Sequence, residues 1–147
     1  MISPTSRHRT NSDAESLPAG YNSTILKEFV DALERWGDAQ TLDVGPVCQE
    51  NITFFAERMA RHHVCDMFSW LKRENDKELR TGDEWEYLDY PERTFDGIQL
   101  WDLCDYLEDD DMIRLVKLCY RMLRASGLLM LIAFEKKPAS SIANTFV

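Results

Sequence analysis

The stretch Thr41-Leu-Asp-Val-Gly45 decides the fold, because it predicts a short buried strand that ends in a tight glycine turn. An acidic residue, Asp66, closes a second short apolar segment 21 residues after Gly45 (66 − 45). Open α/β sheets use this spacing to hold an adenosine-type cofactor, with glycine at the first turn and a carboxylate for the ribose hydroxyls. The spacing therefore predicts a nucleotide-type site at one edge of a parallel sheet. Asp66 at a strand end could also cap the following helix.

The loop that follows Gly45 departs from a phosphate-binding loop. Its sequence is Pro46-Val-Cys-Gln49, where two further glycines would be expected. Proline fixes φ and removes an amide donor, so this loop cannot offer the usual set of backbone N–H groups to a ligand. The loop therefore weighs against NAD or FAD, whose phosphates need those donors, and less against an adenosine cofactor without phosphate.

Helical and strand patterns alternate along most of the chain. We expect a disordered leader over 1–20, one α/β domain over 21–137, and a flexible or edge-pairing tail over 138–147. The expected helices cover 23–36, 50–62 and 109–124, and a charged helix-compatible segment covers 69–80. The expected strands cover 41–44, 63–68, 85–89, 95–101 and 128–134. This alternation predicts a mostly parallel, doubly wound sheet with helices on both faces.

The amino-acid composition makes some classes of binding partner less favourable than others. A net charge of −9 argues against a nucleic-acid backbone or an anionic membrane as the main partner. No segment approaches 18 apolar residues, and the four cysteines are scattered, which favours reduced thiols in a cytoplasmic protein. We expect no metal, because the neighbours His62, His63, Cys65 and Asp66 alternate between strand faces and no second group of ligands is present.

Three pieces together resemble the class I S-adenosylmethionine-dependent methyltransferases. They are Leu42–Gly45, then Val64–Asp66, then Phe95–Asp102 continuing into Leu123–Leu131. The last piece is the most specific, since "FD-x-I-x-x-W-D … R-x-L-R-x-x-G-x-L-x-L" is a habit of that family. The resemblance covers about residues 23–137 and implies a three-layer Rossmann-like sheet. Two departures are the altered glycine loop and the end of the chain, where the last two strands of the family would begin.

The resemblance also implies roles for individual residues toward S-adenosylmethionine. Gly45 and Pro46 would lie against its methionine end, and Asp43 would orient that turn or bond the amino group. Asp66 would accept hydrogen bonds from both ribose hydroxyls. The adenine would lie against Met67 and Phe68 with its edge at Asp89 or Tyr90, and the departing methyl group would lie near Trp101 and Asp102. No residue is identified as catalytic, although Asp102 and Tyr106 are candidates for contacting the nucleophile.

Three functions remain open at this point. The first is S-adenosylmethionine-dependent methyl transfer to an unidentified acceptor. The second is a methyltransferase-like domain that has lost catalysis and serves as a binding or assembly module, which the rewritten loop favours. The third is a nicotinamide-dependent oxidoreductase, which the missing glycines oppose. Trp101 could equally be a core residue, since large aromatic side chains are usually buried.

The final expected strand, 128–134, is uncharged and lacks proline. Such an edge strand invites pairing with another chain. We expect either that a missing segment of a longer chain pairs there, or that this strand and the tail Ser141–Val147 form a homodimer contact.

Overall fold

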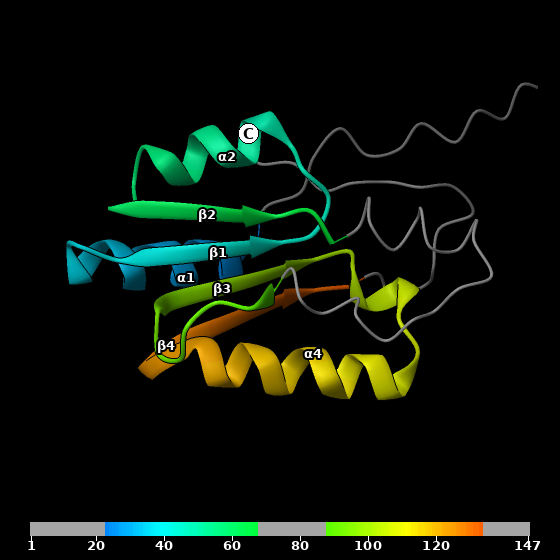
Figure 1. Cartoon of the computed structure of the whole chain (residues 1–147). Helices are drawn as coiled ribbons and strands as arrows, with labels where there is room; N and C mark the ends of the chain where they lie inside the picture. Colours follow the sequence, from blue (N-terminus) through cyan, green and yellow to red (C-terminus); the bar gives the residue numbers. More distant parts are fainter. Residues whose placement is uncertain (1–22, 68–87, 134–147) are drawn as a thin grey trace, which may run out of the picture.

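The computed structural model describes residues 23–67 and 88–133, and these residues form an α/β fold (Figure 1). Their four strands form one all-parallel sheet with the order β2-β1-β3-β4. The bounds are Gln40–Val44 for β1, Arg61–Cys65 for β2, Phe95–Trp101 for β3 and Leu123–Ile132 for β4. The expected parallel sheet is confirmed for this part of the chain.

The strand order contains one reversal. After β1 the chain adds β2 on one side, and it later adds β3 and β4 on the other side of β1. The reversal therefore falls between β1 and β3. In open α/β sheets, ligands bind outside the carboxyl ends of the strands at such a topological switch point.

Helices cover both faces of the sheet (Figure 1). On one face, α1 (Thr24–Trp36) and α2 (Gln49–Ala56) bury Leu33 and Phe55 against Trp101. On the other face, α4 (Asp109–Met122) buries Leu115, Cys119 and Met122 against strand residues that include Leu42, Ile98 and Leu100. Alternate residues of β1 and β3 thus point into different layers, as a parallel sheet covered on both sides requires.

The first helix has the ends that the sequence predicts. Ser23 is its N-cap, and the Ser23 Oγ accepts a hydrogen bond from the Leu26 amide at 3.2 Å. Gly37 follows the helix with a φ of 77°, a conformation that glycine adopts at little cost. The helix packs closely over Gly97, where an added Cβ would lie 2.8 Å from a methyl group of Leu33.

Two predicted helix ends were wrong. The second helix ends at Ala56 instead of residue 62, because the Ala39 carbonyl accepts the amides of Ala60 and Arg61 and starts β2 beside β1. The last helix ends at Met122 instead of 124, and β4 begins at Leu123 instead of at residue 128. The Met122 carbonyl accepts the Thr94 amide at 2.8 Å, which fixes the helix end beside the approach to β3.

Several expected elements lie outside the described residues. These are the leader 1–20, the charged segment 69–80, residues 85–87 of the expected third strand and the tail 138–147. Of that third strand, the structure describes only Leu88 and Asp89, and neither is in a strand.

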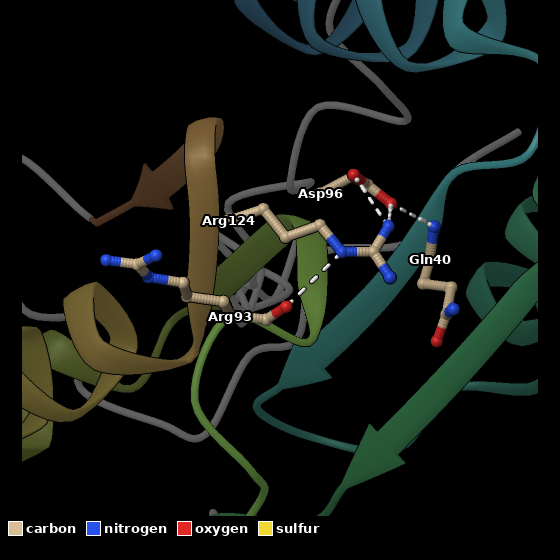
Figure 2. A network of polar contacts seen from close by, with 4 residues as sticks. All are labelled: Gln40, Arg93, Asp96 and Arg124. Atoms are coloured by element: carbon tan, nitrogen blue, oxygen red, sulfur yellow. Dashed lines mark hydrogen bonds and ion pairs between the residues drawn. The ribbon is translucent and has the colours of Figure 1, made fainter.

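A polar network joins the amino-terminal ends of three strands, and Figure 2 shows its members. The Arg124 Nη1 donates to both carboxylate oxygens of Asp96, at 3.1 and 2.9 Å. The same carboxylate accepts the Gln40 amide at 2.8 Å, and Arg124 also donates to the Arg93 carbonyl at 3.3 Å. Asp96 and Arg124 therefore tie β1, β3 and β4 together at the edge opposite the carboxyl ends.

Candidate functional site at the carboxyl edge of the sheet

The carboxyl ends of the four described strands meet at one edge. The register pairs Val44 with Cys65 of β2 and with Leu100 of β3, and pairs Trp101 with Ile132 of β4. Gly45, Asp66 and Asp102 each continue the chain from one of these ends. The structure thus brings these three predicted site residues to one edge, on both sides of the switch point.

Gly45 is required by the close approach of two strands. A Cβ at Gly45 would lie 2.8 Å from the Trp101 carbonyl oxygen and 3.0 Å from the Trp101 Cβ. Gly45 is buried, and its φ is not in the positive region. The absence of a side chain at Gly45 therefore lets the end of β1 lie close to the end of β3 at the switch point. The following residue, Pro46, is half-buried.

Asp43 points into the layer beneath α1 and α2 and is only 3% exposed. Its Oδ1 has no hydrogen-bond partner. Burial raises the pKa of this carboxyl from 3.8 to about 7, because the charged form loses its hydration. A carboxyl with this pKa can present either a charged acceptor or a proton near neutral pH.

Gln99 is the neighbour of Asp43 across the switch point. The two residues are register partners on β1 and β3, so their side chains share one face of the sheet. Gln99 is fully buried, and neither its Oε1 nor its Nε2 has a hydrogen-bond partner. Unsatisfied buried polar groups are costly and uncommon in folded proteins. Two unsatisfied side chains therefore lie together, just inside the sheet edge.

The sequence patterns described above do not single out Gln99. The available signal was a glutamine in the middle of an otherwise apolar strand core, Ile98-Gln-Leu-Trp101. Amide side chains are rarely buried without a reason, so this position could have been singled out.

A second polar row lies one step deeper on the same face. The Thr41 Oγ1 and the His62 Nδ1 are hydrogen-bonded at 2.8 Å, and the imidazole stacks on Phe55 with the ring centroids 5.2 Å apart. The His62 Nε2 is buried without a partner. Burial, and then the neighbouring His63, lower the pKa of His62 to about 4, so the ring is neutral at physiological pH. From the sequence alone, His62 draws attention only as a metal ligand, a role that the alternation of strand faces opposes.

Asp102 marks the exit from β3. It is fully buried and has a φ of 54°, which is uncommon for a residue other than glycine. Its amide donates to the Ile132 carbonyl at 3.1 Å, so the turn after β3 is held to the end of β4. Trp101, just before it, is buried with the α1 and α2 side chains and forms part of the core.

The remaining predicted residues occupy different places. Asp66 follows β2 directly and is half-buried, whereas Met67 is buried in the core beneath α4. Phe68 lies outside the described residues. Tyr106 is half-buried in the short helix Cys104–Tyr106.

Asp89 and Tyr90 lie in the segment that precedes β3. Asp89 is exposed and pairs with Arg121 at 3.7 Å, and the Tyr90 ring lies against Phe95, the first residue of β3, at 5.1 Å. The Tyr90 ring also lies against His63 of β2, with the ring centroids 5.9 Å apart. The role of Asp89 and Tyr90 toward an adenine stays a prediction.

The structure was also searched for pockets, metal-ligand clusters and membrane-spanning helices within the described residues. An open hollow of about 350 Å³ lies on the surface of α2, and its lining contains none of the predicted site residues; it is formed by Gln49, Glu50, Thr53, Phe54, Glu57 and Arg58. No cluster of three metal-ligating side chains occurs within 23–67 and 88–133. Over the same ranges, no helix has the length and apolar character needed to cross a bilayer.

Comparisons with known proteins do not assign the chain to a family. A scan against protein-family models gave no match, and searches of curated proteins and of solved structures gave no similar sequence or structure.

Proposed function

We propose that this chain is a Rossmann-like, class I methyltransferase-type domain that binds S-adenosylmethionine and transfers its methyl group to an unidentified acceptor. The observation that carries the proposal is the buried, unsatisfied pair Asp43 and Gln99 at the switch point between β1 and β3. A ligand with donors and acceptors at this edge would supply the partners that the two side chains lack.

The side chains at the edge fit the two polar ends of the cofactor. Asp66 lies one strand away from Gly45, at the carboxyl end of β2, and its carboxylate can accept both ribose hydroxyls. The Asp43 carboxylate can accept a hydrogen bond from the ammonium group at the methionine end of the cofactor. The positive charge of that group would favour the ionised form of Asp43. Gln99 can donate through Nε2 and accept through Oε1 beside it.

When bound, the sulfonium supplies an activated methyl group for in-line transfer. Such a reaction depends on positioning and on exclusion of water, and it needs no general base. Buried Trp101 and the turn at Asp102, which is anchored to β4, give this edge a rigid wall. No side chain is assigned a proton-transfer role.

The alternative is a binding or assembly module that has lost catalysis. Pro46 directly follows the tight contact between Gly45 and Trp101 and offers no amide to a ligand, and this observation favours the alternative. The same feature opposes a nicotinamide-dependent oxidoreductase, because a pyrophosphate needs more backbone donors than a sulfonium amino acid does.

Calorimetric titration separates these functions. S-adenosylmethionine, its demethylated product S-adenosylhomocysteine, and NAD are each titrated into the full chain. We expect saturable binding of the first two ligands and none of NAD. Asp66→Asn should weaken binding at least about tenfold, whereas the exposed control Asp38→Asn should leave it unchanged. If the chain does not bind S-adenosylmethionine at millimolar concentration, it has neither the proposed cofactor site nor the proposed methyltransferase activity.

A further inference from the structure

The switch point provides a partner for a positive charge. Asp43 is only 3% exposed, and its Oδ1 has no hydrogen-bond partner. An ionised carboxyl group accepts hydrogen bonds and donates none, so Asp43 suits an ammonium group and repels a second carboxylate. The methionine end of S-adenosylmethionine carries both an ammonium and a carboxylate. The carboxylate therefore needs a different partner at this edge.

The backbone beside Asp43 does not provide that partner. Gly45 is followed by Pro46, which has no N–H to donate. On the neighbouring strand, the Asp102 amide already donates to the Ile132 carbonyl at 3.1 Å. The two turns that meet at the switch point thus lack a free amide at the positions directly after Gly45 and Trp101.

The start of α2, where the chain continues after that turn, already holds a carboxylate. Glu50 lies in the first turn of this helix, and its Oε2 accepts the Cys48 thiol at 2.9 Å. Hydrogen bonds from this thiol and from the Glu50 amide lower the pKa of the Glu50 carboxyl, so it is ionised at neutral pH. A negative side chain of the protein itself therefore lies at the positive end of the helix dipole, and a ligand carboxylate gains little there.

The loops that leave the carboxyl ends of the strands are acidic. In the described part of the chain these loops are 45–48, 66–67 and 102–108, and they contain no lysine or arginine. Their charged residues are Asp66, Asp102, Asp105 and Glu108. Arg93 and Arg124 lie at the opposite edge, in the network of Figure 2. The charges near the site thus favour a cation over an anion.

Gln99 is a neutral donor beside Asp43. Its Nε2 has no partner and can donate one or two hydrogen bonds. A neutral amide does not balance the charge of a carboxylate, and an unbalanced charge is costly to remove from water. Gln99 therefore does not replace the missing cation.

We infer that the site recognises the ammonium group of its ligand and not a carboxylate, so that its preferred ligand is an adenosyl sulfonium with a primary ammonium and no carboxylate. This inference rests on the proposed function and specifies the ligand chemistry of the same site. Decarboxylated S-adenosylmethionine has this chemistry, because it differs from S-adenosylmethionine only in the absence of the carboxylate. Asp43 accepts its ammonium, and Asp66 accepts the ribose hydroxyls as before.

Calorimetric titration of the full chain at neutral pH tests the inference with both ligands. We expect decarboxylated S-adenosylmethionine to bind at least about fivefold more tightly than S-adenosylmethionine. A smaller preference, or tighter binding of S-adenosylmethionine, would overturn the inference and leave the proposed cofactor site in place. If neither ligand binds at millimolar concentration, both the inference and the proposed function are wrong.

A pair of variants in the turn after β1 tests the physical cause. Pro46→Ala restores a backbone N–H and should improve S-adenosylmethionine binding by about two- to fivefold, with little change for the decarboxylated ligand. Val47→Ala, at a 51% exposed position of the same turn, adds no donor and should keep the wild-type preference. An unchanged preference in Pro46→Ala, or an equal loss of preference in Val47→Ala, would show that the missing amide does not set the preference and would overturn the inference.

Discussion

Replacement of Asp43 by asparagine should remove a pH-dependent loss of stability. The carboxyl has a pKa of about 7 in the folded chain, against 3.8 when it is exposed. The folded state therefore holds a proton that the unfolded state has released between these two values. Stability should fall as pH rises from about 4 to 7 and stay reduced above pH 7. The difference of about three pH units corresponds to a cost of about 4 kcal/mol for the ionised form.

Urea unfolding between pH 5 and 8.5 covers about two of these three pH units, which corresponds to about 3 kcal/mol of this cost. Asparagine keeps the shape of the side chain without its charge. The stability of Asp43→Asn should therefore increase relative to that of the wild type as pH rises. With a typical urea slope of about 2 kcal/mol per molar, the relative midpoint should move by about 1–2 M over the range. Asp38→Asn, at an exposed position, is the control and should run parallel to the wild type. Parallel curves for Asp43→Asn as well would refute the account of a buried, unsatisfied carboxyl.

Four further outcomes follow from the structure. The wild type should lose stability as pH falls from 6.5 to 4, because the lowered pKa of His62 makes the unfolded state the better proton acceptor there, and His62→Asn should abolish this loss. Acid unfolding of both chains is followed by fluorescence, and the same dependence of stability on pH in both would contradict this expectation. Gly97→Ala should destabilise by about 1–3 kcal/mol in thermal unfolding, because the added methyl meets Leu33 of α1, and an unchanged melting temperature would contradict this packing. Asp96→Ala should cost about 1–3 kcal/mol in urea unfolding, with no effect on ligand affinity, because the Gln40 amide loses its acceptor and the Arg124 guanidinium keeps only the Arg93 carbonyl. S-adenosylmethionine affinity should weaken by up to about tenfold per pH unit below pH 7 as Asp43 becomes protonated, and calorimetry that shows a pH-independent affinity would exclude Asp43 as the acceptor of the ammonium.

The elements that local patterns define could be predicted from the sequence. The first helix begins after its Ser23 cap and ends before Gly37, and β3 covers Phe95–Trp101 as expected. Both segments carry their own signals, namely a cap, a glycine and a continuous apolar run. The parallel order followed from the alternation of these elements.

Element ends that depend on contacts between distant segments were missed. The end of α2 is set by the Ala39 carbonyl and the end of α4 by the Thr94 amide, and neither partner is visible in the local pattern. The same holds for the site. Spacing placed Gly45 and Asp66 at one edge, but only the register of β1 and β3 reveals that Gln99 lies beside Asp43. The position of Asp89 depended on the path of the chain before β3.

The most direct test of the central claim is a two-dimensional amide NMR titration of the chain with S-adenosylmethionine. A cofactor at the switch point should shift the amide signals of Gly45, Asp66 and Asp102 most, and these shifts should saturate together. The amides of Trp36 and Tyr120, which are exposed and lie near the ends of α1 and α4 on the amino-terminal side of the sheet, should stay in place. Absence of saturable shifts at millimolar ligand, or shifts centred on α2 or α4, would contradict a cofactor site between β1 and β3.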